Sequence, residues 1–297
     1  MAEPALLYEK REGIAYITFN RPQVRNALSP EVFCRLVDAW QDYAVDDSLR
    51  VAIITGAGDR AFTAGADLGT FIPLLSGARQ PEDEWDRRVL QDSQVSDVAI
   101  LRGFPLYKPI IAAINGFCLG AGTELIQATD LRIAATHATF ALTEVMRGFM
   151  PAGGSTIRLP RQIPLCKAME ILLIGEHMNA QEAYRIGLVN EIVPPDQVMT
   201  RAEEQARKIA ANGPVAVRKI KETVLRSLGV SLEEGFAIEN ENAKVVLATE
   251  DAKEGPRAFM EKRPPRHVAR QSVGPATRSS TRGTYQYGFR ARRRNTS

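Results

Sequence analysis

Two acidic residues are the strongest candidates for chemistry because each lies close to a glycine-rich turn. Glu124 falls in the first turn of a helix predicted over residues 123–129, directly after the turn at residues 116–122. Glu144 lies in a short, mostly apolar segment, and residues 151–155 form a second glycine-containing stretch soon after it. Paired carboxyl groups can donate and accept protons, and free N–H groups at a helix N-terminus favour developing negative charge. The pattern predicts a site for an anion with two carboxyl groups beside it.

Each of these acids also has a structural explanation. Glu124 can act as a helix N-terminal acid that the helix dipole stabilises, and Glu144 can be a surface residue on a short strand. The glycine-rich turns can serve only to let a strand and a helix pack tightly. The residues alone leave both explanations open.

The elements around the two acids predict an α/β fold. The apolar run at residues 110–114 predicts a strand buried on both faces, and strands are also predicted at residues 14–19, 51–55 and 131–135. A helix is predicted to begin after Ser29, because a serine cap precedes a proline and an acid, and to continue to about residue 43. The order strand, helix, strand indicates a parallel sheet with crossover helices.

The later part of the chain is predicted to be mainly helical. Residues 61–68 form another turn of small residues, and the charge-rich segment 71–104 predicts a loop followed by a long surface helix. Beyond residue 154 the predicted helices cover about residues 164–173, 180–186, 195–211, 215–227 and 232–247. The chain thus combines an α/β core with a helical C-terminal third.

Composition indicates an ordinary soluble protein. The 297 residues are 44% hydrophobic and 25% charged, which is enough to bury a full core. No apolar run approaches the ~20 residues of a membrane helix, and the first residues lack the pattern of a signal peptide, so we expect a cytoplasmic protein. No metal site is expected, because only three histidines are present and no cysteines have ligand spacing. Buried, reduced thiols are expected at Cys34, Cys118 and Cys166.

Charge divides the chain into two unequal parts. Residues 266–297 contain eight arginines and no Asp, Glu or Lys, which leaves 30 basic and 35 acidic side chains elsewhere, a net charge of −5. This tail lacks Leu, Ile and Met, so it is predicted to be disordered. Its arginines are interleaved with Tyr285, Tyr287 and Phe289, so a nucleic-acid-binding role through the tail is a possible but disfavoured alternative.

Five sequence blocks, taken together, resemble the enoyl-CoA hydratase/isomerase, or crotonase, family. The similarity runs from Leu6 to Arg263, and the blocks lie at residues 62–68, 114–125, 140–154, 178–190 and 250–259. The resemblance implies a spiral of ββα units that holds a coenzyme A thioester. It also implies three parts: an α/β core with the acyl-CoA site at residues 1–195, a helical region at 196–265 and the basic tail at 266–297.

The resemblance also implies catalytic roles for four residues. Ala66 and Ala121 match the family's oxyanion-hole positions, whose backbone N–H groups bind the thioester oxygen. Many relatives carry glycine at position 121, and alanine suffices there unless φ is positive. Glu124 and Glu144 match the glutamates with which hydratases hold and ionise a water molecule, whereas isomerases usually keep only the second. Retention of both favours a hydratase, with isomerisation or another acyl-CoA reaction as the alternative.

Substrate contacts and assembly are implied in the same way. The turn before Asp67 is expected to lie along the adenine and pantetheine, and the C-terminal residues to reach the ligand of a neighbouring subunit. Coenzyme A enters as part of the substrate, and no separate cofactor is expected. Relatives form trimers or paired trimers through their helical region, so a homotrimer or hexamer is expected. The residues implied in substrate binding are Ala64, Asp67, Leu68, Gly122, Phe259 and Lys262.

The composition of the tail generates a first prediction. Deleting residues 266–297 should leave thermal stability and turnover nearly unchanged, because the segment has no apolar pattern with which to dock. Thermal unfolding and steady-state kinetics of the truncated protein check this. A loss of more than ~2 kcal/mol in the free energy of unfolding would contradict it.

Overall fold

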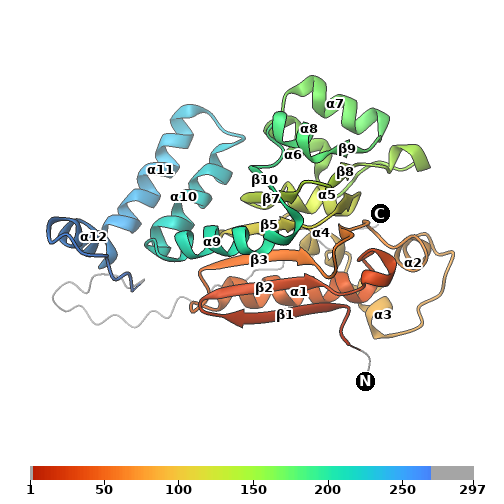
Figure 1. Cartoon of the computed structure of the whole chain (residues 1–297), viewed down its shortest axis with the longest axis horizontal. Coiled ribbons are helices and arrows are strands. Elements are labelled where there is room, and N and C mark those ends of the chain that lie inside the picture. The colour runs from red at the N-terminus through yellow and green to blue at the C-terminus, as the bar shows by residue number, and fades with distance from the viewer. Residues whose placement is uncertain (1–2, 269–297) are drawn as a thin grey trace, which may run out of the picture.

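Two β-sheets lie at the centre of the computed structural model, which describes residues 3–268 (Figure 1). The larger sheet has six strands in the order β1-β2-β3-β5-β7-β10, and all neighbours are parallel except the β1–β2 hairpin. The predicted parallel sheet is therefore confirmed. Its strands are β1 (Leu6–Arg11), β2 (Ile14–Phe19), β3 (Val51–Gly56), β5 (Ile110–Ile114), β7 (Leu131–Ala135) and β10 (Glu191–Val193).

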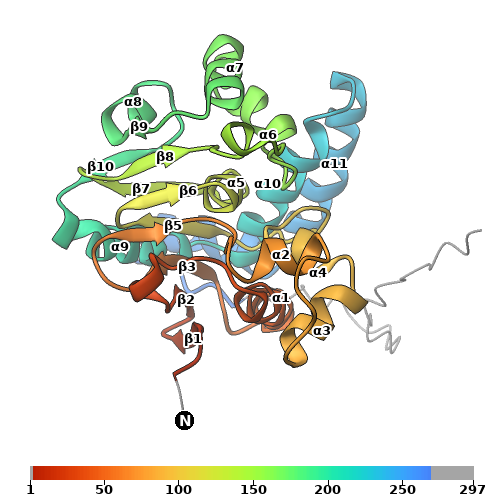
Figure 2. The ribbon, with the colours of Figure 1, turned by 90° about the vertical axis from the view of Figure 1, so that its right-hand side faces the viewer.

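The smaller sheet has four strands, three of which directly follow strands of the larger sheet. Its order is β4-β6-β8-β9, with bounds Ala61–Thr63, Phe117–Leu119, Thr139–Ala141 and Met178–Asn179. The chain therefore alternates between the sheets in the pairs β3/β4, β5/β6 and β7/β8, and helices follow each pair. Figure 2 shows the strands of both sheets one above another, with helices beside them. This repeated unit of two strands and a helix confirms the predicted spiral.

Strand β1 was missed by the sequence prediction, which began the sheet at residues 14–19. Its outer half, Glu9 to Arg11, is charged and exposed, as suits the edge strand of a sheet, so it carries little of the apolar pattern on which the prediction relied. The chain reverses at Glu12 and Gly13, both of which have positive φ values, 51° and 77°. Such a pair is typical of a tight hairpin turn.

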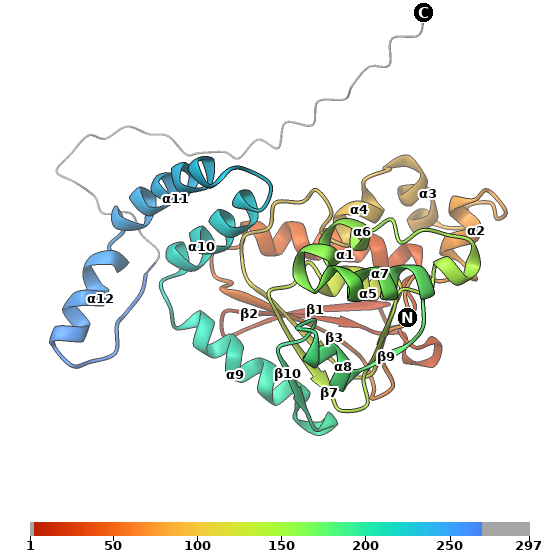
Figure 3. The same cartoon turned by 90° about the horizontal axis from the view of Figure 1, so that it is seen from above.

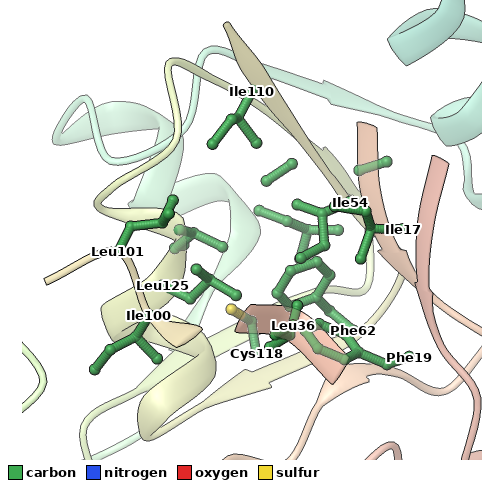
Figure 4. Close-up of a cluster of buried hydrophobic side chains, with 14 of the residues drawn as sticks. Ile17, Phe19, Leu36, Ile54, Phe62, Ile100, Leu101, Ile110, Cys118 and Leu125 are labelled. Carbon is green, nitrogen blue, oxygen red and sulfur yellow. The ribbon is translucent and has the colours of Figure 1, made fainter. Parts of the chain in front are cut away.

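Helix α1 (Pro30–Val45) fixes the position of the segments that lead to the site. It begins at Ser29, whose side chain accepts a hydrogen bond from the N–H of Val32, as predicted. Its buried Trp40 donates to the carbonyl of Ala99 at 3.0 Å, and its buried Tyr43 donates to the carbonyl of Pro109 at 2.7 Å. Apolar side chains fill the space between the sheets and the helices; ten are labelled in Figure 4: Ile17, Phe19, Leu36, Ile54, Phe62, Ile100, Leu101, Ile110, Cys118 and Leu125.

The segment 71–104 differs from its prediction. In place of one long surface helix it forms three short helices, α2 (Phe71–Leu75), α3 (Glu84–Gln91) and α4 (Val95–Ala99). Asp83 caps α3 by accepting the N–H of Asp86, and Asp92 at its other end has extended φ and ψ. The capping and stop residues divide the segment, although the charge pattern suggested continuity.

The other helices follow the prediction closely, with α6 and α12 as additions. In the core they are α5 (Ala121–Ile126), α6 (Ser155–Gln162), α7 (Leu165–Ile174), α8 (Ala180–Arg185) and α9 (Val198–Ala210), with 3-10 turns at Pro22–Val24, Val145–Arg147 and Pro195–Gln197. Helices α10 (Pro214–Ser227), α11 (Leu232–Leu247) and α12 (Asp251–Met260) extend away from the sheets (Figure 3).

Two expectations need adjustment at the surface. Cys34 and Cys118 are buried as predicted, but Cys166 is exposed, because it lies on the outer side of α7. The backbone N–H groups of Arg266 and Val268 donate to Glu254 and Asp251 of α12, so the first residues of the predicted tail are ordered. The rest of that tail, 269–297, lies outside the described residues.

Candidate active site

The turn between β6 and α5 places Glu124. Gly120, the residue before α5, has φ 52° and ψ −124°. This backbone conformation is strained for any residue that carries a side chain, so glycine is favoured here. Helix α5 begins at Ala121, two residues earlier than predicted, and Glu124 lies in its first turn as predicted. Ala121 itself does not have a positive φ, so alanine fits this position without strain.

The turn after β4 packs directly against the turn that precedes α5. Gly65 has φ 89°, and a Cβ atom at this position would lie 2.8 Å from the carbonyl oxygen of Leu119 and 3.4 Å from the nitrogen of Ala121. Only glycine allows this approach. Because β4 and β6 are neighbours in the smaller sheet, Ala66 and Ala121 come together although they are far apart in the sequence.

The backbone N–H groups of Ala66 and Ala121 are available to a ligand. The N–H of Leu28 donates to the carbonyl of Gly65, and the carbonyl of Leu28 accepts from the N–H of Asp67. Because successive N–H groups of an extended segment point to opposite sides, the N–H of Ala66 points away from Leu28. Ala121 is the first residue of its helix, where N–H groups lack intrahelical acceptors. Within residues 3–268, no hydrogen-bond acceptor is found for either N–H group.

The carboxyl group of Glu124 is buried in the wall of the cavity. Its side chain is 4% exposed, and Oε1 accepts a 3.3 Å hydrogen bond from the N–H of Ser155, the first residue of α6. Burial raises the pKa of Glu124 to about 7, and the negative charge of Glu144 adds to this rise. Hydrogen bonding from Ser155 and the charge of Arg158 act in the opposite direction.

Glu144 comes to the same place from a different element. It directly precedes the 3-10 turn Val145–Arg147, and burial raises the pKa of its carboxyl group too. A Cβ atom on Gly120 would lie 3.0 Å from its Oε1, so the carboxyl group rests against the turn before α5. Its Oε2 is buried without a hydrogen-bond partner among the described residues, which is costly unless a ligand or water binds there.

These groups share one cavity of about 530 Å³. Of the residues predicted for the site, six line it: Ala64, Ala66, Leu68, Ala121, Glu124 and Glu144. Aromatic and aliphatic side chains from α1, α2 and the end of α4 form an apolar wall that includes Phe33, Phe71 and Ile100. The rings of Phe33 and Phe71 stack with centroids 4.1 Å apart. The cavity therefore joins a polar centre to an apolar surface.

Four of the residues implied in substrate binding lie elsewhere in this chain. The carboxylate of Asp67 is held by Arg21 at 2.8 Å, which keeps its pKa below the usual range although burial opposes this. Gly122 packs on Thr63, where a Cβ atom would lie 2.4 Å from a methyl carbon. Phe259 and Lys262 are exposed, in and just after α12, which lies away from α5 in Figures 1 and 3.

Sequence reasoning missed several residues that complete the cavity. Gly153 lies in the second glycine-containing stretch, 151–155, but the sequence assigned no role to it. A Cβ atom there would lie 2.5 Å from Oε2 of Glu124 and 2.3 Å from Cδ1 of Ile100. Ile100 and Phe33 carried no recognisable signal, because they are ordinary apolar residues of helical segments until the chain folds.

Residues 3–268 contain neither a candidate metal site nor a candidate membrane span. No group of three or more His, Cys, Asp or Glu side chains there is arranged to hold a metal ion. No helix in this range is long and apolar enough to cross a membrane.

Two buried carboxyl groups and two unpaired backbone N–H groups around one cavity suit an enzyme that moves protons beside a carbonyl group. The sequence model described as enoyl-CoA hydratase/isomerase matches residues 9–270. The chain belongs to this family, which confirms the resemblance drawn from the five sequence blocks.

Individual relatives cover almost the whole described chain. Enoyl-CoA hydratase EchA19 of Mycobacterium tuberculosis is 40% identical over 262 residues, which are 88% of this chain and 96% of that protein. The (E)-benzylidenesuccinyl-CoA hydratase of Thauera aromatica is 39% identical over 257 residues, 86% of this chain and 96% of that one. A crystal structure of enoyl-CoA hydratase from Bacillus anthracis, 36% identical, has a TM-score of 0.81 and covers 89% of this chain and 99% of its own.

The packing of Gly153 generates a second prediction. The Gly153→Ala substitution should lower acyl-CoA turnover by ~10-fold or more, because the atoms nearest the new methyl group are the movable ends of Glu124 and Ile100. Stability should change by less than ~2 kcal/mol, because those side-chain ends can shift. Steady-state kinetics and thermal unfolding check both effects.

Gly229→Ala is the matched control, because a Cβ atom there meets nothing within 4 Å. It should leave turnover at the wild-type value. Wild-type turnover in Gly153→Ala would show that the position of the Glu124 carboxyl group does not limit the reaction.

Proposed function

We propose that this protein is an enoyl-CoA hydratase, which adds water across the 2,3 double bond of a trans-2-enoyl-CoA thioester. The observation that carries the proposal is the pair of carboxyl groups, Glu124 and Glu144, that line one cavity, Glu144 against Gly120 and Glu124 against Gly153. The hydratase names of the two relatives and of the crystal structure support it.

The geometry fits the chemistry of water addition. The water oxygen attacks the β-carbon while one carboxylate accepts a proton from that water. The other carboxyl group, which is protonated, gives its proton to the α-carbon. Negative charge develops on the thioester oxygen during this step. The N–H groups of Ala66 and Ala121 are proposed to bind that oxygen, and each such donor lowers the barrier by about 3 kcal/mol in comparable enzymes.

The raised pKa values of the pair support this division of labour. Burial disfavours a charge on either group, and one negative charge disfavours the second. A pair of this kind retains one proton near neutral pH, so an acid and a base are present together. The unpartnered Oε2 of Glu144 is the place where a water molecule is proposed to bind.

The remaining expectations belong to the same proposal. The acyl group is proposed to lie along the apolar wall, and the pantetheine along Ala64 and Leu68 at the cavity wall. Phe259 and Lys262 are proposed to reach a neighbouring subunit's ligand in a homotrimer or hexamer. Exposed apolar side chains on the C-terminal helices support assembly: Ile220, Val224, Leu225, Leu228, Leu232, Phe236, Leu247, Phe259 and Met260.

The proposal predicts hydration without an added metal or redox cofactor. Purified, chelator-treated protein should consume short, medium or aromatic trans-2-enoyl-CoAs, as shown by loss of the conjugated absorbance and by formation of the 3-hydroxyacyl-CoA. A protein inert toward the whole panel would contradict the proposal. Double-bond migration without water addition would identify an isomerase instead.

The two carboxyl groups provide a sharper prediction. Glu124→Gln and Glu144→Gln keep the shape of the side chain but cannot transfer the proton, so each should lower kcat by ~100-fold or more. Affinity for a saturated acyl-CoA, measured by calorimetry, should stay nearly unchanged. The double variant should be little slower than the slower single variant, because the two groups act as a unit.

Exposed glutamates serve as controls for these substitutions. Glu170→Gln, on the outer face of α7, should keep wild-type kinetics. Near-normal activity in Glu124→Gln together with an inactive Glu144→Gln would favour an isomerase-like mechanism with a single acid. Near-normal hydration in both variants would show that neither group does the chemistry.

A further inference from the structure

Arg158 of α6 joins two parts of the cavity wall. Its guanidinium donates to the carbonyl of Ile100 at 3.2 Å and to the carbonyl of Leu101 at 2.7 Å. Ile100, in turn, rests against Gly153, where an added Cβ atom would lie 2.3 Å from Cδ1. The arginine therefore holds the end of α4 against the loop that surrounds the Glu124 carboxyl group.

The segment that Arg158 holds is a strained one. Leu101 has φ 58°, a left-handed conformation that is unfavourable for a branched, bulky residue and costs ~1 kcal/mol or more. Figure 4 shows Ile100 and Leu101 beside Leu125 of α5, the helix that carries Glu124. Such a conformation persists only where neighbouring groups fix it, and the two hydrogen bonds from Arg158 do so.

A second arginine closes the same contact from the other direction. Arg102 donates to the carbonyl of Ala152 at 2.9 Å and also contacts Asp97 at 3.1 Å. The end of α4 is thus tied to the loop 151–154 by Arg102 and to α6 by Arg158. The two arginines differ in their surroundings, because Arg102 is exposed and paired with an acid, whereas Arg158 is partly buried and forms no ion pair with a described residue.

The charge of Arg158 acts on the site. Gly154 covers the guanidinium so closely that a Cβ atom there would lie 3.2 to 3.4 Å from three of its atoms. Burial lowers the pKa of Arg158, the charge of Glu124 opposes this, and that of Arg102 adds to it. The charges that act on Glu124 are those of Glu144 and Arg158, and Arg147 acts on Glu144. Other charged side chains that line the same cavity are Arg25, Asp97 and Arg102.

We propose that Arg158 is a positioning residue of the hydration reaction. It fixes the turn at Ile100 and Leu101 against the loop 151–154, which packs on the Glu124 carboxyl group, and its charge favours the ionised form of that group. This inference rests on the proposed function. Two like-charged carboxyl groups must retain one proton between them at the working pH, and a nearby cation sets how easily the first of them ionises. Arg158 thus shapes the cavity and sets the pH range of activity together.

The test compares two substitutions of Arg158 with a control in the same helix. Arg158→Met keeps the length of the side chain without charge, and Arg158→Lys keeps the charge but cannot donate along the same two directions. Arg161→Met removes an exposed cation, whose hydrogen bond among residues 3–268 goes to the carbonyl of Ile157 in the same helix. For each variant kcat and KM are measured from pH 5 to pH 10, with a saturated acyl-CoA as the binding probe.

The expected results separate charge from shape. In Arg158→Met both limbs of the pH profile should move to higher pH by about 0.5 to 1 unit, because the carboxyl groups lose a stabilising cation. Arg158→Lys should keep the limbs near their wild-type positions while kcat falls by ~3- to 10-fold, because the turn is less well fixed. Arg161→Met should match the wild type in both respects.

Other outcomes decide against the proposal. Wild-type limbs in Arg158→Met would overturn the charge role, and wild-type kcat in Arg158→Lys would overturn the positioning role. If Arg158→Met does not fold, Arg158→Gln replaces it in the same comparison.

Absence of hydration in the wild-type protein would contradict the proposed function instead. The carboxyl titration of Glu124, followed by NMR on protein with ¹³C-labelled glutamate, would then test Arg158 directly. That titration should move to higher pH in Arg158→Met, and an unchanged titration would overturn the inference.

Discussion

Two carboxyl groups buried in one cavity cannot both ionise easily, and this repulsion governs the arrangement of the site. Glu124 is raised to a pKa of about 7 by burial and by the charge of Glu144. In water the same two side chains would both be ionised at neutral pH, and the site would lack an acid. The cavity, the backbone donors at Ser155 and the guanidinium of Arg158 together determine how strongly each proton is held.

Backbone geometry supplies the other half of the site. The parallel pairing of β4 with β6 brings two turns into contact, and glycines at positions 65 and 120 allow the approach. Unlike a side chain, an N–H group in such a turn loses no rotamer freedom when a ligand binds, so the donors of the proposed oxyanion site need no rearrangement. The spiral repeat has a functional role here, because it sets adjacent strands from distant parts of the sequence side by side.

Much of this organisation could be predicted from the sequence, for identifiable reasons. Strands such as residues 110–114 are continuous apolar runs, and Ser29 with the proline that follows gives a clear helix start, so these elements were found. The edge strand β1 and the division of residues 71–104 into three helices were missed, because charged side chains hide the first and local caps decide the second. Exposure of Cys166 depends on how α7 packs, which a run of apolar neighbours does not reveal.

The site shows the same division between local and non-local information. Glu124 and Glu144 were found because each lies beside a glycine-rich turn, and the family resemblance gave them roles. Arg158 and Ile100 act through contacts between segments more than fifty residues apart in the chain, and no local pattern predicts these. The turn before Asp67 was expected to lie along the substrate; in the folded chain Ala64 and Leu68 line the cavity, and Arg21 holds the carboxylate of Asp67.

Separation of the chemical centre from the apolar wall has a consequence for evolution. The two backbone N–H groups and the two carboxyl groups come from the turn after β4, from α5 and from the residue before the 3-10 turn Val145–Arg147. The apolar side chains of Phe71, Ile72 and Ile100 come from the segment 71–104, which lies outside both sheets. On the proposed function, changes at Phe71 and Ile72 can alter the acyl groups that fit, whereas Ile100, which lies against Gly153 beside Glu124, is tied to the position of that carboxyl group. A lineage can therefore acquire new substrates by insertion or substitution in one surface segment while the reaction itself is inherited intact.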